Sequence, residues 1–251
     1  QLKVLARYGV GYDSIDVDYA ATKGVWVTNT PGANATSVAE NAVTDIMLLA
    51  KRSFEMATLM RQGQQRAAKQ IFGHELAGST VGIVGYGHIG QAVAKMLSGL
   101  GVKTLIYNRT KRPTEFGEYV DLETLLQRSD FVTLHIAATK QTEHLLGERE
   151  FGMMKSSASL INLARGSVVD EQALIKALNE HQIASAALDV FDEEPLPADS
   201  PFYQMDNVFL TPHTGSSTVE AGQNMAMGAA KMIDEVLSGQ KPEWAVNKPQ
   251  L

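Results

Sequence analysis

Apolar residues along the chain fall into short runs that alternate with segments of helical periodicity. Short apolar runs separated by helical segments are typical of βα units and a parallel sheet. Six such runs follow residue 80, at 81–85, 103–107, 131–136, 159–163, 184–189 and 207–210. Six strands in this rhythm predict an α/β fold with a doubly wound parallel sheet.

The two ends of the chain predict a second, incomplete domain. Its expected strands and helices are 3–6, 16–23, 25–28 and roughly 218–238. Two βα units are too few to make an independent sheet. We therefore expect 1–39 and 219–251 to form part of a second domain that lacks an N-terminal piece, and 40–218 to form the larger domain.

A glycine-rich loop follows the first strand of the larger domain. Gly85, Gly87 and Gly90 form a Gly-x-Gly-x-x-Gly sequence between an apolar run and a helical segment. In this arrangement the first glycine permits a tight turn, the second lets the backbone approach a pyrophosphate, and the third lets helix pack on strand. The free N–H groups of the helix N-terminus attract the anion. The context predicts a Rossmann dinucleotide-binding domain rather than a glycine-rich turn without a ligand.

The loop after the strand 103–107 lacks the acidic residue that NAD enzymes usually place there. Asn108 occupies that position, and three cations follow within residues 109–112. An aspartate or glutamate would hold the ribose 2′-hydroxyl, whereas Arg109 can bind a 2′-phosphate through charge-assisted hydrogen bonds. We therefore expect NADP as the cofactor. NAD stays possible if the cations form only a solvated basic loop.

Three charged or titratable residues follow the last strands, where ligands of open α/β sheets bind. They are Arg165, Glu194 and His213. Reduction of a 2-oxo acid needs a proton donor, a cation for the carboxylate and carbonyl oxygen, and a carboxylate that holds the donor. Histidine, arginine and glutamate suit these roles, although each alone also fits a salt bridge, a solvated loop or a helix cap. Their occurrence at three strand ends favours catalysis.

Five separated motifs resemble, in the same order, those of the D-isomer-specific 2-hydroxyacid dehydrogenases. They span residues 8–16, 85–90, 162–166, 189–195 and 212–218. The resemblance covers almost the whole chain. It implies that the incomplete domain is a flavodoxin-like substrate (catalytic) domain and that the protein is an NAD(P)-dependent enzyme acting on CH–OH groups.

The resemblance also implies roles for individual residues. The family counterpart of Arg165 binds the substrate carboxylate and polarises the carbonyl, that of His213 is the general acid/base, and that of Glu194 pairs with the histidine. The backbone N–H groups of Val10 and Gly11 are expected to bind the substrate carboxylate. The expected cofactor contacts are Gly85, Gly87, His88, Ile89, Gly90, Asn108, Arg109, Thr110, Ala137, Ala138, Thr142, Ala164, Asp189 and Gly215.

Some positions depart from the family pattern. After the third strand the family commonly has a proline, whereas this chain has Ala137 and Ala138, which we still expect to line the adenine side. Asn108 and Arg109 replace the acidic NAD determinant, as in family members that prefer NADP. Asp189 keeps the family's aspartate, which contacts the nicotinamide carboxamide.

A long helical pattern runs from Thr36 to about Gly63, and with residues 70–76 it resembles the family's dimerisation arm. Its apolar face needs a partner to be buried, and a twofold homodimer would supply one. We therefore expect the dinucleotide-binding domain to carry this arm and the protein to be a homodimer.

The composition argues against several classes of binding partner and of chemical site. The formal net charge of −6 gives no attraction to phosphate backbones or anionic lipid, and no apolar run is long enough to span a membrane. The absence of cysteine excludes disulfides, thiolate metal sites and a cysteine nucleophile. The histidines outside the expected site lack metal-ligand spacing. We expect a cytoplasmic protein with no metal site and neither nucleic acid nor membrane as a partner.

The function expected from these features is hydride transfer between NADPH and a small 2-oxo acid such as glyoxylate or hydroxypyruvate. One alternative is NAD-dependent oxidation of D-3-phosphoglycerate, because those enzymes share all five motifs. An alternative of another class is a dinucleotide-sensing, corepressor-like binding protein. A third is an inactive fragment that folds only around a cofactor.

Overall fold

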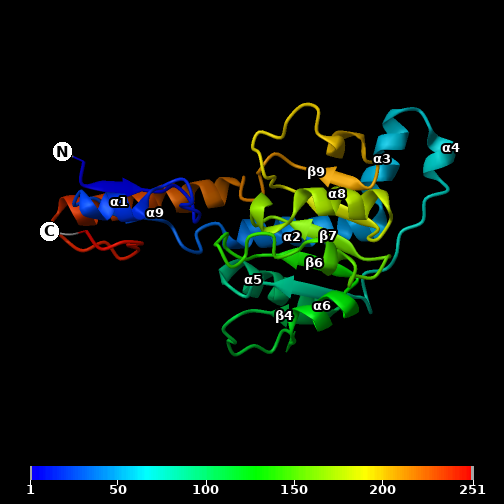
Figure 1. Ribbon diagram of the computed structural model, residues 1–251, viewed down its shortest axis with the longest axis horizontal. Coiled ribbons are helices and arrows are strands. Elements are labelled where there is room, and N and C mark those ends of the chain that lie inside the picture. The colour runs from blue at the N-terminus through cyan, green and yellow to red at the C-terminus, as the bar shows by residue number, and fades with distance from the viewer. Residues whose placement is uncertain (1, 250–251) are drawn as a thin grey trace. The chain divides into compact units, whose positions relative to one another are not determined.

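The computed structural model describes residues 2–249 (Figure 1). The chain divides into two compact units, one made of residues 1–38 and 216–251 and the other of residues 39–215. Residues 1, 250 and 251, which belong to the expected substrate domain, lie outside the described residues. The assignment of the two units to substrate and cofactor stays a prediction at this point.

The larger unit contains a parallel sheet of seven strands in the order β5-β4-β3-β6-β7-β8-β9. The strands are β3 (Thr80–Val84), β4 (Lys103–Tyr107), β5 (Glu118–Tyr119), β6 (Phe131–Leu134), β7 (Ser159–Asn162), β8 (Ser185–Leu188) and β9 (Val208–Leu210). The first strand of this sheet along the chain, β3, lies inside the sheet. The strands β4 and β5 follow on one side of β3, and the chain then crosses back to place β6 on its other side. The doubly wound sheet predicted from the sequence is therefore confirmed, with the two-residue β5 as an addition.

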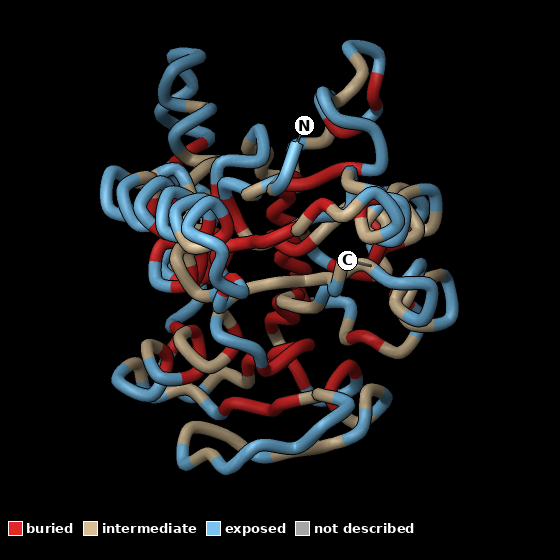
Figure 2. Tube along the Cα trace, turned by 90° about the vertical axis from the view of Figure 1, so that its left-hand side faces the viewer, coloured by how far each residue is buried: buried red, intermediate tan, exposed pale blue. Residues whose placement is uncertain are grey.

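The sheet is buried along its central strands. Every residue of β6 and β7 is buried, and four of the five residues of β3 are. Strands covered on both faces read as continuous apolar runs, which explains why these segments stand out in the sequence. Figure 2 shows the buried stretches concentrated inside the molecule, with exposed residues on the loops and outer helices.

Helices and short 3₁₀ turns precede β3 or lie between the strands that follow it. They are α2 (Ala35–Lys51), α3 (Ser53–Arg61), α4 (Gln65–Ala68), α5 (His88–Leu97), η1 (Ser98–Leu100), α6 (Leu122–Arg128), α7 (Glu148–Phe151), η2 (Gly166–Val168), α8 (Glu171–Asn179) and η3 (Pro201–Gln204). Asp121 and Asp170 cap α6 and α8, because each carboxylate accepts a hydrogen bond from a backbone N–H of the first turn.

The prediction of one continuous helix from Thr36 to about Gly63 is wrong. The helix is divided into α2 and α3 at Arg52, whose φ of 51° is left-handed. The N–H of His74 donates to the carbonyl of Ala50 at 2.7 Å, so a distant segment satisfies one of the carbonyls that the end of α2 leaves free. The break follows from this contact between segments far apart in the sequence.

The smaller unit is built on a parallel pair of strands, β1 (Val4–Ala6) and β2 (Trp26–Thr28), with α1 (Val17–Thr22) between them in sequence. The C-terminal helix α9 (Val219–Leu237) completes it, and Thr218 caps this helix by accepting from the N–H of Ala221. Three buried residues form a small core where α1 packs on β2, namely Ala20, Val25 and Val27. The strands and helices expected at both ends of the chain are thus present.

Candidate active site

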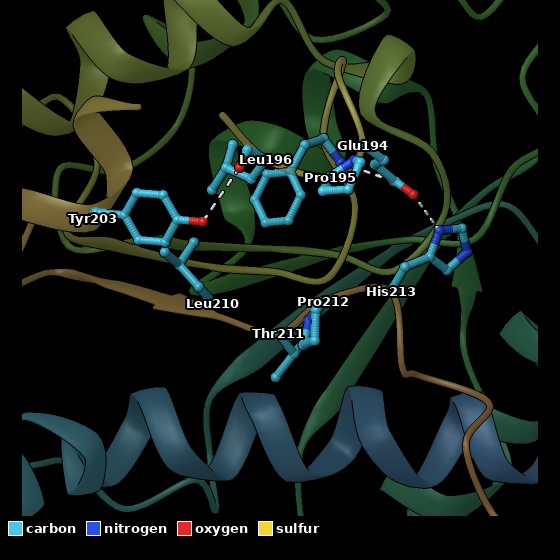
Figure 3. Close-up of a pocket in the computed structure, with 9 residues that line it drawn as sticks. Glu194, Pro195, Leu196, Tyr203, Leu210, Thr211, Pro212 and His213 are labelled. Carbon is cyan, nitrogen blue, oxygen red and sulfur yellow. Dashed lines mark hydrogen bonds and ion pairs between the residues drawn. The ribbon is translucent and has the colours of Figure 1, made fainter. Parts of the chain in front are cut away.

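His213 and Glu194 form a close pair beyond the carboxyl ends of β9 and β8. The Nδ1 atom of His213 lies 2.6 Å from Oε2 of Glu194, and the two side chains point toward each other (Figure 3). The other carboxylate oxygen, Oε1, accepts a hydrogen bond of 3.2 Å from the N–H of Phe191. The carboxylate is therefore fixed on one side by the backbone and holds the imidazole on the other, which leaves Nε2 for another partner.

The backbone of His213 is held in an uncommon conformation. Its φ of 54° lies in the left-handed region, which only a few per cent of non-glycine residues adopt. The N–H of His213 donates to the carbonyl of Asp189 at 2.8 Å, so the main chain at the end of β8 fixes the loop that carries the imidazole.

Arg165 lies in a turn at the end of β7 that Asn162 organises. The Asn162 amide accepts from the N–H of Ala164 and donates to the carbonyl of Arg165, both at 3.0 Å. The next residue, Gly166, packs so closely that a Cβ there would lie 2.0 Å from the carbonyl carbon of Phe191. This contact places the arginine turn directly against the loop that begins at Phe191 and leads to Glu194.

Asp189 organises the loop between β9 and the end of the larger unit. It is 3% exposed, and its carboxylate accepts hydrogen bonds from Thr211 Oγ1 at 2.6 Å and from the N–H groups of Thr214 at 2.7 Å and Gly215 at 2.8 Å. A Cβ on Gly215 would lie 3.0 Å from this carboxylate. Asp189 therefore acts as an anchor for the loop containing His213, a role that the sequence did not reveal.

Asp45 on α2 is a buried carboxyl group that the sequence also did not reveal. It is 3% exposed. Burial, and secondarily the negative charge of Asp189, raises the pKa of Asp45 from 3.8 to about 7. An aspartate within a helical apolar pattern gives no sign of such burial, because only the packing of α2 in this unit creates it.

The glycine loop has the geometry that a dinucleotide requires. Gly85 has a φ of 99°, and a Cβ there would lie 2.5 Å from the carbonyl oxygen of His135. A Cβ on Gly90 would lie 2.1 Å from the carbonyl oxygen of Gly85, whereas the corresponding position on Gly87 has no atom within 4 Å. Gly87 is the N-cap residue of α5 and makes no side-chain cap hydrogen bond. Space over the second glycine and an uncapped helix N-terminus fit a pyrophosphate.

The other expected cofactor contacts lie in loops near this turn. Asn108 follows β4, and its amide accepts from the N–H of Tyr86 at 3.0 Å and donates to the carbonyl of Thr110 at 2.6 Å. Arg109 and Thr110 are exposed. After β6, Thr142 Oγ1 donates to the carbonyl of Ala137 at 2.7 Å, which closes the loop containing Ala138. Because β6 and β4 flank β3, these loops lie at the same edge of the sheet as the glycine turn.

A cavity of about 560 Å³ adjoins the His213–Glu194 pair. Its lining residues are Phe191, Glu194, Pro195, Leu196, Tyr203, Leu210, Thr211, Pro212 and His213 (Figure 3). All of these belong to the larger unit, as do the expected cofactor residues. Val10 and Gly11 belong to the smaller unit, where their carbonyls accept hydrogen bonds from Asn29 and Arg7.

Within residues 2–249, no group of three or more His, Asp or Glu side chains is arranged to hold a metal ion. In the same residues, no helix has the length and apolar character needed to cross a bilayer.

A doubly wound parallel sheet, a glycine turn at its switch point and a paired histidine at a later strand end define a dinucleotide-dependent dehydrogenase. Residues 43–215 match the family model described as "D-isomer specific 2-hydroxyacid dehydrogenase, NAD binding domain". The chain belongs to this family. It is accordingly an NAD(P)-dependent oxidoreductase that acts on the CH–OH group of 2-hydroxy acids.

Individual relatives agree with this assignment. The chain is 45% identical over 261 residues to a glyoxylate reductase of Thermococcus litoralis, covering 100% of this chain and 78% of the relative. It is 41% identical over 257 residues to a D-3-phosphoglycerate dehydrogenase of Methanocaldococcus jannaschii, covering 100% of this chain and 48% of that relative. The crystal structure of the TT0316 protein from Thermus thermophilus superposes with a TM-score of 0.92 at 38% identity, covering 98% of this chain and 79% of that one.

Proposed function

We propose that the protein reduces a small 2-oxo acid, such as glyoxylate or hydroxypyruvate, with NADPH, and that His213 is its proton donor. The observation that carries the proposal is the 2.6 Å contact between His213 Nδ1 and Glu194 Oε2. The choice of substrate is supported by similarity to a glyoxylate reductase at 45% identity.

The chemistry divides among the residues of the larger unit. Bound NADPH supplies the hydride to the substrate's carbonyl carbon. The imidazolium of His213 donates a proton from Nε2 to the carbonyl oxygen, while Glu194 holds Nδ1 and offsets the positive charge of the ring. Arg165 binds the substrate carboxylate and draws electron density from the carbonyl through its positive charge. The role of Val10 and Gly11 in binding the carboxylate stays a prediction.

The cofactor preference rests on the loop after β4. Asn108 is neutral, and its amide is hydrogen-bonded to Tyr86 of the glycine turn and to Thr110 of its own loop, so it presents no negative charge to a 2′-phosphate. Arg109 is exposed beside it. Asp189 and Gly215 are proposed to lie at the nicotinamide end, Ala164 beside them, and Ala137, Ala138 and Thr142 at the adenine end.

The first experiment measures the initial rates of NADPH and NADH oxidation with glyoxylate or hydroxypyruvate. We expect the rate with NADPH to be the higher at limiting cofactor. Oxidation of D-3-phosphoglycerate with NAD is measured in parallel, since a relative carries that activity in its name. Activity with phosphoglycerate alone would refute the proposed substrate.

The proton donor is tested with a matched pair of variants. His213 and His181 both have a φ of 54°, a conformation that asparagine tolerates. General acid catalysis contributes about 10²–10⁴-fold, so His213→Asn should lose at least about 10²-fold in turnover. The exposed His181→Asn should keep normal turnover. Near-normal turnover of the His213 variant would refute the assignment.

The homodimer and the cytoplasmic location are also proposals. The segment after α2 exposes two large apolar side chains, Met60 at 51% and Phe72 at 77%. A twofold interface that covers this arm would remove both from water.

A further inference from the structure

Tyr86, the second residue of the glycine turn, is buried although the turn needs no side chain there. The tyrosine is 1% exposed, in contrast to the open space over the neighbouring Gly87. Pyrophosphate binding at such a turn depends on glycines and backbone N–H groups rather than on this side chain. Phenylalanine would fill nearly the same volume, so the buried hydroxyl group needs a separate explanation.

The hydroxyl of Tyr86 is hydrogen-bonded to the loop that follows β4. It lies 2.5 Å from Oγ1 of Thr114, and that oxygen also accepts from the N–H of Phe116 at 3.0 Å. The N–H of Tyr86 donates to Asn108 Oδ1 at 3.0 Å. A single residue of the glycine turn therefore holds both ends of the segment from Asn108 to Thr114.

This segment carries the exposed cations Arg109, Lys111 and Arg112. A second tyrosine supports it from β5, because the N–H of Arg112 donates to the Tyr119 hydroxyl at 2.9 Å and Lys111 Nζ lies 5.9 Å from the ring centroid. The rings of Tyr86 and Tyr119 meet edge to face, with centroids 5.8 Å apart. The two tyrosines thus form one support under the basic segment.

We propose that Tyr86 is a positioning residue for cofactor specificity, whose hydroxyl holds residues 109–112 beside the glycine turn so that they bind the phosphate monoester of an adenosine 2′-phosphate. The inference rests on the proposed use of NADPH and adds the residue that orders its binding loop. A basic segment that is held in place binds the phosphate without first losing conformational freedom, which a mobile segment would have to lose on binding. The hydroxyl has no part in the hydride transfer itself.

The test is Tyr86→Phe in the full chain, which keeps the ring and removes the hydroxyl. Loss of one buried hydrogen bond should raise the KM for NADPH about 5–10-fold, while the KM for NADH and the kcat at saturating NADPH stay within about twofold. Thr114→Val removes this bond and also the acceptor of the Phe116 N–H, so it should raise the KM for NADPH at least as much. The double variant should be no worse than Thr114→Val alone, because the bond that Tyr86→Phe removes is then already lost. Tyr19→Phe, an exposed tyrosine of the smaller unit, is the control and should change neither KM.

Calorimetry with adenosine 2′,5′-bisphosphate and with AMP gives a readout independent of turnover. We expect Tyr86→Phe to weaken binding of the bisphosphate about 5–10-fold and that of AMP less than about twofold. If the wild type prefers NADPH and the variant keeps that preference, the role of Tyr86 is refuted and the cofactor assignment stands. If the wild type binds the bisphosphate no better than AMP, the NADPH assignment fails first, and the specificity role of Tyr86 falls with it.

Discussion

Asp45 makes the stability of the larger unit depend on pH in a way that one substitution should abolish. Its carboxyl group is 3% exposed, and burial together with the charge of Asp189 raises its pKa from 3.8 to about 7. Between these two pH values the folded protein keeps the Asp45 proton, whereas the unfolded chain releases it. Unfolding then releases a proton, so the free energy of unfolding falls as the pH rises.

The size of this effect follows from the pKa shift. A shift of one unit corresponds to about 1.4 kcal/mol, so a change from 3.8 to about 7 removes about 4 kcal/mol of stability once the pH exceeds the folded pKa. Part of this loss already occurs below about pH 5, and about 2.5 kcal/mol of it falls between about pH 5 and about pH 8. The amide introduced by Asp45→Asn would be neutral throughout and would not show the loss.

The assay is thermal unfolding of wild type and Asp45→Asn, followed by circular dichroism at several pH values from about 5 to about 8. Because other titrating groups are the same in both proteins, the difference in stability isolates Asp45. For a unit of this size, about 2.5 kcal/mol corresponds to about 5–10 °C, so the variant should gain that much in Tm relative to wild type as the pH rises. Asp206→Asn, which changes an exposed carboxyl group in a turn, is the control.

A difference between Asp45→Asn and wild type that stays constant from about pH 5 to about pH 8 would refute the reasoning. It would mean that Asp45 is already ionised in the folded protein at the lower pH, and that water or a local rearrangement solvates the carboxylate.

Three further predictions concern the site and the arm. Gly166→Ala should lower the Tm by several degrees and reduce turnover, because its Cβ would lie 2.0 Å from the carbonyl carbon of Phe191. Differential scanning calorimetry checks the Tm, and an unchanged value would contradict the contact. Glu194→Gln should reduce kcat by about 10²-fold with little change in cofactor affinity, since an amide cannot offset the imidazolium charge; full activity would contradict the pairing with His213. Phe72→Glu should yield monomers by light scattering after gel filtration, whereas a dimer of unchanged affinity would place the interface elsewhere.

Six of the seven described strands of the larger unit could be predicted, because each of the six carries a local signal. The six runs after residue 80 are rich in apolar residues, as is typical of parallel strands covered on both faces, and the glycines mark the turn after the first. The two-residue β5 has no such run, since Glu118 and Tyr119 are paired only at the edge of the sheet. The division between α2 and α3 also had no local signal.

The break between α2 and α3 shows that a periodic apolar pattern alone does not predict where a helix ends. Apolar spacing continues across Arg52, and arginine has no preference for a left-handed conformation. The break depends instead on Gly73, where a Cβ would lie 2.6 Å from the Cα of Lys51, and on the bond from the His74 N–H to the Ala50 carbonyl. Both contacts join residues more than twenty positions apart, so only the folded chain brings them together.

In the candidate site, the residue types could be predicted from the sequence, whereas the hydrogen bonds that hold these residues in place could not. The residue types at the strand ends indicated a proton donor, a cation and a carboxylate, because these chemistries are visible in single residues. The supports were not visible: the carbonyl and carboxylate of Asp189 bind the N–H groups of His213, Thr214 and Gly215. The Asp189 and His213 motifs are therefore two halves of one hydrogen-bonded unit. Removing the Asp189 carboxylate would release the loop that positions the imidazole, so its loss should impair proton donation as well as any contact with the nicotinamide.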